Sequence, residues 1–237
     1  MPRVLLFAGI GLSLLGSDGC GGGPSLPLAI AAARNAADTV RALLFDHHDP
    51  DQRDAGGVTP LMWAARHGAA DAMRALLDAG ADPAARDTRN GWTPLLHAVH
   101  TRQPAAVRLL LDRGADPNQR AAQTTPLIMA AADPDPAIVE LLLAHGADPY
   151  QRGAGGSTAL TVAVSGGALS DIDRPLFGGC HAATVKALLA RHPLLTLPDT
   201  IAAGEALWWA RFHGCAEVLS LVGHPTPRLN GGATPAA

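Results

Sequence analysis

The side chains that could do chemistry in this 237-residue chain are chiefly its ten histidines, its three cysteines and its 21 carboxylates. His97 and His100 would lie one helical turn apart, a spacing that metal ligands use. At the expected register, however, no carboxylate or cysteine stands beside this pair, and His47 and His48 fall in a predicted loop. We therefore predict that the histidines have surface and packing roles and that the chain holds no metal ion.

The sequence also lacks a recognisable catalytic set. Nucleophilic catalysis needs a serine or cysteine with a base and oxyanion donors close by, and no local motif supplies that combination. No motif indicates a cofactor either. We predict a non-enzymatic protein that uses no cofactor. An acid and a base converging in a groove would be needed to favour an enzyme.

The elements that would position these side chains repeat along the chain. The phrase Gly-Ala-Asp-Pro begins at Gly80, Gly114 and Gly146, and each copy is followed by Thr-Pro-Leu or Thr-Ala-Leu. The threonines of the latter motif are Thr59, Thr93, Thr125 and Thr158, which gives steps of 34, 32 and 33 residues. A period near 33 residues predicts stacked copies of one supersecondary unit.

Each copy predicts two short antiparallel helices followed by a hairpin-like finger. Thr59 can cap a helix with its hydroxyl, and Pro60 fits the first turn, where no amide hydrogen is needed. Gly68 ends this helix. Apolar residues recur at helical spacing over 72–77, and Gly80 can adopt the left-handed conformation that closes a helix. The finger occupies the irregular residues before the next threonine.

Six units of this kind follow one another. Those starting at Thr59, Thr93 and Thr125 fit best. Thr158 to about Leu197 is a degenerate copy with an insertion at 166–180, while Pro27–Asp54 and Glu205–Val222 fit as end units. Six units exceed the three or so that a continuous core needs, so we expect the chain to fold alone, as a monomer.

The repeated pattern Gly-x-Thr-Pro-Leu, then Ala-Ala, a Gly, and Val-x-Leu-Leu-Leu-x-x-Gly-Ala-Asp resembles the ankyrin repeat over roughly residues 26–222. This resemblance implies an all-α solenoid and a non-enzymatic module that binds another protein. The departures are Met62, Leu96, Ile128 and Thr161 where the family has histidine, and Pro134 and Pro136 where Gly-His would join the helices. They leave the fold prediction intact.

The resemblance also implies where a partner binds, because fingers and first helices line a concave face in such stacks. The corresponding positions are Arg89, Asn90 and Trp92 on one finger, Val58 on another, and Arg66, His67, His100, Thr101, Asp133, Phe212 and His213 on the helices. Trp92 is the preferred anchor, since an exposed aromatic side chain buries a large area at little entropic cost. The alternative is that Trp92 packs over a neighbouring finger. The insertion 166–180 is a second candidate surface, or an idle loop.

The N-terminal residues 1–25 differ from the repeats. Residues 4–15 form an apolar run that is too short to span a bilayer but suits a secretory signal. Cys20, ahead of a glycine tract, resembles the acceptor of a bacterial lipoprotein. We expect export, to a periplasmic or membrane-anchored location, with a lipid on Cys20. The alternative is an uncleaved N-terminus on a cytoplasmic protein.

The remaining cysteines, Cys180 and Cys215, fall on the same edge of neighbouring units. They could form a disulfide if the insertion bends Cys180 inward, or remain two partly buried thiols.

The composition narrows the class of partner. A formal net charge of −3 and the lack of a basic stripe argue against nucleic-acid binding. We expect a protein partner of unknown identity. The further alternatives are an immunity-type inhibitor of a secreted toxin or hydrolase, and a cytoplasmic scaffold or effector. The residues 223–237 form a predicted disordered tail.

Overall fold

The structure of this chain is a computed structural model that describes residues 24, 26–121, 123–167 and 179–223. The predicted signal segment, the lipidation candidate Cys20, residues 168–178 of the insertion and the tail beyond Gly223 lie outside the described residues. The repeats that were predicted to bind a partner are described almost completely.

The described residues form six consecutive pairs of short α-helices, as the period predicted. These are α1 (Pro27–Ala33) and α2 (Ala37–Phe45), α3 (Pro60–Arg66) and α4 (Ala70–Asp78), α5 (Pro94–His100) and α6 (Pro104–Asp112), α7 (Pro126–Ala130) and α8 (Ala137–Ala144), α9 (Ala159–Val164) and α10 (Ala182–Arg191), and α11 (Ile201–Phe212) and α12 (Ala216–Leu221). A 3-10 turn, η1 (Ala154–Gly156), lies in the finger before α9. We number the pairs as units one to six.

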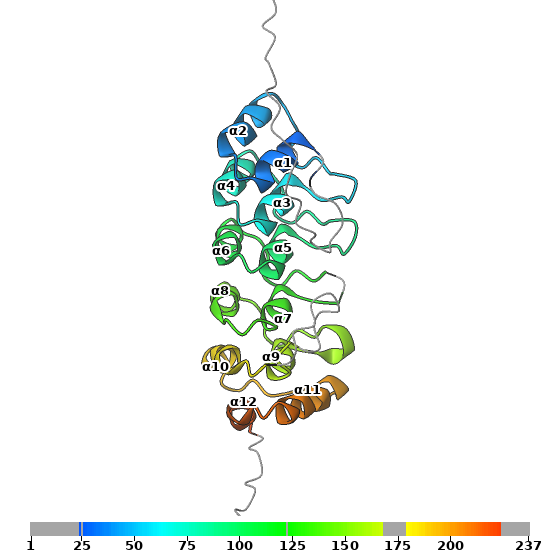
Figure 1. The fold of residues 1–237 in the computed structure, drawn as a ribbon, viewed down its shortest axis with the longest axis vertical. Coiled ribbons are helices and arrows are strands. Elements are labelled where there is room, and N and C mark those ends of the chain that lie inside the picture. Colours follow the sequence, from blue (N-terminus) through cyan, green and yellow to red (C-terminus); the bar gives the residue numbers. More distant parts are fainter. Residues whose placement is uncertain (1–23, 25, 122, 168–178, 224–237) are drawn as a thin grey trace, which may run out of the picture.

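The pairs stack into an elongated solenoid with two columns of helices (Figure 1). The first helices of the units form one column, the second helices form the other, and the fingers project beyond the first column (Figure 1). Each first helix packs against the first helices of its neighbours and against its own partner helix. Because neighbouring units cover one another, the exposed surfaces of the inner units are faces that run along the stack.

Threonine caps set the start of five first helices. The hydroxyls of Thr59, Thr93, Thr125, Thr158 and Thr200 each accept a hydrogen bond from the backbone amide three residues later, at 3.2–3.4 Å. These caps occupy amides that would otherwise be unsatisfied in the first turn. The repeat of threonine along the sequence is thus a repeat of helix starts.

The C-terminal ends of the second helices in units two to four depend on glycine. Gly80, Gly114 and Gly146 have φ of +89°, +84° and +83°. A Cβ at these positions would meet no other atom within 4 Å, so the left-handed backbone is the reason for glycine there.

One continuous apolar core runs through all six units. It contains leucines from both columns, including Leu61, Leu95, Leu110, Leu142 and Leu188, which are fully buried. Pairs such as Ala64–Ala65 keep the columns close, because alanine fills little of the space between helices.

Backbone hydrogen bonds close the fingers as short hairpins. Asp54 donates to the carbonyl of Val58, Asp87 to that of Trp92, and Gly153 to that of Ser157. Ala121 and Thr124 exchange two such bonds in an isolated antiparallel bridge. The predicted hairpin-like fingers are therefore present.

Arginines join successive fingers. Nη1 of Arg53 donates to the carbonyls of Gly57 and Arg86, and Nη1 of Arg86 donates to the carbonyls of Gly91 and Arg120. The first acceptor of each arginine lies in its own finger and the second in the next. We call this series the arginine ladder.

The last unit departs from the predicted boundaries. Its first helix, α11, begins at Ile201 rather than Glu205, because Thr200 supplies a cap that lies outside the repeat period. At 12 residues, α11 is longer than any other helix of the first column. It packs against α9 and η1, so it covers the end of both the helix column and the last finger. No helix within the described ranges has the length and apolar character needed to cross a membrane.

Candidate functional site

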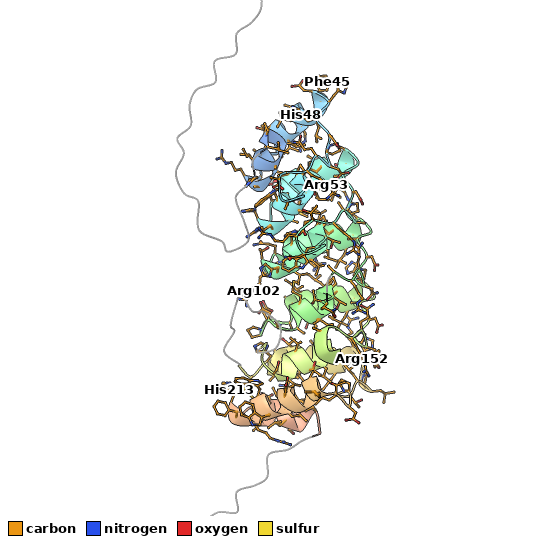
Figure 2. The ribbon with its side chains drawn as sticks, turned by 90° about the vertical axis from the view of Figure 1, so that its right-hand side faces the viewer. Phe45, His48, Arg53, Arg102, Arg152 and His213 are labelled. Atoms are coloured by element: carbon orange, nitrogen blue, oxygen red, sulfur yellow. A yellow bond between two sulfur atoms is a disulfide. The ribbon has the colours of Figure 1, made fainter. Side chains whose placement is uncertain are left out.

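The predicted partner-binding positions lie where the first helices end and where the finger that carries Trp92 meets α5. We call this surface the inner face. It comprises Arg66, His67, Arg89, Asn90, Trp92, His100, Thr101, Arg102 and Asp133. Figure 2 shows Arg102 and His213 along one edge of the stack, with Arg152 of a finger on the opposite side.

Trp92 lies against the helix of its own unit. Its ring centroid is 5.5 Å from that of His97 and 4.9 Å from that of His100, and the side chain is half-buried. The indole therefore packs against α5 of its own unit rather than lying free in solvent. It presents part of its surface on the inner face while the histidines of α5 fix its orientation.

A carboxylate lies beside His97, which corrects the expectation that none would. Oδ2 of Asp87 is 3.0 Å from Nε2 of His97, and both side chains are almost fully buried. The finger folds back over its own helix and brings Asp87 onto a residue ten positions later, a contact that helical spacing alone does not reveal.

Asp87 also organises the finger. Its Oδ1 accepts hydrogen bonds from the backbone amides of Arg89 and Asn90. Burial acts to raise the pKa of Asp87, but the hydrogen bonds from His97, Asn90 and Trp92 outweigh it and leave the pKa below its ordinary value. The carboxylate is therefore ionised near neutral pH and holds both the finger and the histidine.

Unit two uses the same device with different residues. Nε1 of Trp63 donates to Oδ2 of Asp54 at 2.9 Å, and the guanidinium of Arg66 lies 5.5 Å from the centroid of the Trp63 ring. His67 packs against the same ring at 6.0 Å. Two of the predicted residues, Arg66 and His67, are thus grouped around an aromatic side chain that sequence reasoning did not select.

Arg102 is the functional candidate that sequence reasoning missed. Its backbone has φ +57°, a left-handed conformation in which the matching positions of units two and six have Gly68 and Gly214. Its guanidinium forms an ion pair with the carboxylate of Asp133 in the next unit. The arginine side chain is 48% exposed while that of Asp133 is 17% exposed. The sequence feature that could have identified Arg102 is an arginine at the position of the helix-to-helix turn where other units have glycine.

The inner face continues from Asp133 into unit five. The hydroxyl of Thr184 donates to the carbonyl of Asp133 at 2.8 Å. His181 is buried near the same carboxylate, and its Nδ1 has no hydrogen-bond partner among the residues that the structure describes. Burial lowers the pKa of His181, although a hydrogen bond with the backbone of Ala131 and the charge of Asp133 act in the opposite direction. The neutral form of this histidine is therefore favoured.

Phe212 and His213 belong to a separate aromatic group. Phe212 stacks on Trp208, with 5.3 Å between centroids, and His213 stacks on Trp209 at 5.5 Å. All four residues lie at the C-terminal end of α11 or just beyond it. The two tryptophans were not selected from the sequence, although their adjacency in a helix with exposed positions was a visible signal.

Cys180 and Cys215 are joined by a disulfide, with 5.3 Å between their Cα atoms. Cys215 is the buried N-cap of α12, and Cys180 precedes the N-cap of α10. These two helices are neighbours in the second column, so their N-terminal ends meet. The bond therefore ties unit five to unit six.

The inner face offers hydrogen-bond donors and aromatic surface rather than reactive groups. Within the described ranges, no three histidine, cysteine, aspartate or glutamate side chains are gathered where they could hold a metal ion. The arrangement suits the recognition of another macromolecule's surface, in which aromatic and arginine side chains carry much of the binding energy.

Comparison with known proteins agrees with the repeat. A family model described as ankyrin repeats (3 copies) matches residues 28–121, and a second, described as ankyrin repeats (many copies), matches residues 110–163. No curated protein matches the chain.

Proposed function

This chain belongs to the ankyrin-repeat family, and on that premise we propose that it binds a protein partner on its inner face, around Trp92, His100 and Arg102. Members of this family are interaction modules rather than enzymes as a rule. Beyond this general role, we propose which surface binds the partner, which residues anchor it and in which compartment the protein works.

The observation that carries the proposal is the backbone of Arg102. A non-glycine residue in the left-handed region costs about 1–3 kcal/mol, and such residues cluster at functional sites. The ion pair with Asp133 is half open to solvent, so it offsets little of this cost. The strain is consistent with a need for a guanidinium at this point of the inner face.

The neighbouring residues fit the same role. Among the described residues, Asp133 engages part of the guanidinium, which has five donor hydrogens, and we propose that the remaining donors bind an acidic group of the partner. Trp92, held by His97 and His100, supplies an oriented aromatic surface close by. We propose that the partner presents a carboxylate to Arg102 and an apolar group to Trp92.

We further propose that this module works outside the cytoplasm. The disulfide between Cys180 and Cys215 supports this location, because such bonds persist in oxidising compartments and are rare in the cytosol. The apolar run at 4–15 and Cys20 point the same way as a sequence pattern, and they lie outside the described residues.

The binding proposal is tested by capture with a matched pair of variants. Arg102→Ala removes the guanidinium from the inner face. Arg113→Ala removes one from the second column, where Arg113 pairs with Asp78 of the preceding unit at 2.8 Å. After crosslinking in the native host, a partner should be retained by the wild type and by Arg113→Ala and lost with Arg102→Ala. Equal retention by both variants would place binding elsewhere.

The location is tested on thiols trapped in intact cells. Acid quenching followed by alkylation should leave Cys180 and Cys215 unmodified until reductant is added. The intact mass then shows whether the chain begins at Cys20 with acyl mass added. Two freely reactive thiols on a full-length cytosolic chain would refute the extracytoplasmic proposal and favour an intracellular scaffold.

A further inference from the structure

The outer face of α11 is an apolar stripe at the end of the solenoid. Helix α11 lies at the end of the stack opposite α1, packed against α9 on one side (Figure 1). Its exposed residues are Ile201, Gly204, Glu205, Trp208, Arg211 and Phe212. They recur at the three- and four-residue spacing of a single helical face. Trp208 is 57% exposed and Phe212 is 69% exposed.

Such a face is unusual for an end unit. Terminal repeats of a solenoid need a polar outer surface to remain soluble, because no further unit covers them. Here the last unit places tryptophan, phenylalanine and isoleucine at that position. A contiguous exposed apolar surface of this kind marks an interaction site.

Gly204 is the second observation. It lies inside α11, where glycine destabilises a helix relative to alanine. Its φ is not in the left-handed region, and a Cβ added there would meet nothing within 4 Å. Neither backbone geometry nor internal packing therefore requires glycine. What glycine does provide is a hollow in an otherwise bulky stripe.

The order of residues along the stripe is self-complementary. If a second α11 packs antiparallel with Trp208 at the two-fold axis, a residue a given number of positions after Trp208 faces the one the same number before it. Phe212 then lies over Gly204 of the other copy, and Arg211 lies opposite Glu205. Neither Arg211 nor Glu205 has an ion-pair partner among the described residues.

We propose that this stripe is the interface of a homodimer, in which two copies of α11 pack antiparallel about Trp208. Each Phe212 fills the hollow at Gly204 of the other copy, and two Glu205–Arg211 ion pairs flank the tryptophans. Such an interface is isologous, so it closes after two copies. The number of repeats predicts a monomer. The exposed apolar stripe is the reason that we propose a dimer instead.

The size of the surface sets the expected affinity. One pair of 12-residue helices buries less than the roughly 1,200–2,000 Å² of a standard stable interface. We therefore expect a dissociation constant of roughly 1–100 µM.

Sedimentation velocity of the mature chain across this concentration range tests the proposal. Gly204→Ala should raise the dissociation constant at least tenfold, because a methyl group occupies the hollow meant for Phe212. The same variant should melt at a higher temperature when dilute, since alanine favours the helix and its Cβ has room. Loss of dimer without loss of fold separates an interface role from a structural one.

Charge reversal tests the register. Glu205→Arg and Arg211→Glu should each weaken the dimer, and the double variant should restore it. The matched control is reversal of the exposed Asp38–Arg41 pair on α2, which should leave association unchanged. A chain that stays monomeric at all concentrations would overturn the proposal. So would a dimer that is insensitive to Gly204→Ala, and in either case the stripe serves a different partner.

Discussion

The centre of the solenoid and its C-terminal end are held together in different ways. In units two and three, the finger carboxylates Asp54 and Asp87 and the arginine ladder recur with the sequence period. In units five and six, the connection from α9 to α10 is long, and the disulfide and the extended helix α11 link the neighbours instead. Hydrogen bonds that repeat from unit to unit need a constant spacing of residues. Where an insertion breaks that spacing, a disulfide and helix packing can still join the units.

The largest effect should come from the central core. Leu110 is fully buried between the columns, and Leu110→Ala should lower the free energy of unfolding by about 2–5 kcal/mol through lost transfer energy and a cavity. Chemical denaturation measures this. Leu109→Ala is the control, because Leu109 is only partly buried, and equal losses for the two variants would contradict the register of α6.

The end of the stack should respond almost as strongly to loss of its covalent bond. Cys180→Ala opens a link between residues 35 apart, which is worth roughly 3–4 kcal/mol of unfolding free energy in the chain-entropy model. Adding reductant to the wild type should reproduce the loss. Reductant should not affect the variant, and a wild type that is indifferent to reductant would show that the bond contributes nothing.

The finger carboxylate of unit three should matter less than either. Asp87→Ala leaves the amides of Arg89 and Asn90 and the ring of His97 without their acceptor, which should cost about 2–3 kcal/mol. Asp54→Ala in unit two should cost less, since Asp54 is only half-buried. The finding that would contradict this order is a larger loss at Asp54 in the same unfolding titration.

The C-terminal half should also carry a dependence on pH. Because burial lowers the pKa of His181, the unfolded chain takes up its proton first as pH falls through 6.5, the ordinary pKa of histidine. The contribution of His181 to stability is therefore highest above pH 6.5 and declines as pH drops towards its folded pKa. The melting temperatures of the wild type and of His181→Gln, measured as a function of pH, should converge at acidic pH. Parallel curves would assign the dependence to other groups.

The smallest effect on stability is expected at Arg102. In Arg102→Gly, relief of the left-handed backbone is opposed by loss of a partly exposed ion pair and by the larger entropy of glycine in the unfolded chain, so the unfolding free energy should change by about 1 kcal/mol or less. Binding of the partner should nevertheless be lost. A strongly destabilised variant would make Arg102 a structural residue, and an unchanged affinity would remove it from the inner face.

Much of the fold was predictable because its determinants are local. Thr59, Thr93 and Thr125 cap helices within three residues, and Gly80 closes a helix through its own φ. The start of unit six was predicted wrongly because Thr200 falls outside the period. There the helix boundary follows the local cap rather than the repeat.

The inner face was less accessible to sequence reasoning. Residues such as Trp92 and Asp133 could be placed on it from the repeat alone. The side-chain contacts of this face could not be predicted in the same way. Asp87 meets His97 only when the finger folds back, and Arg102 meets Asp133 of the adjacent unit. Long-range side-chain pairing is not encoded in the period.

The arginine ladder also has a consequence for motion. Arg53 and Arg86 each bond a carbonyl of their own finger and one of the next, so a displacement of one finger strains the acceptor of its neighbour. We therefore expect that a partner that displaces the finger of Trp92 also displaces the fingers bonded to it. We expect the work of bending to be shared among these linked fingers, so that contact at one finger shifts its neighbours as well.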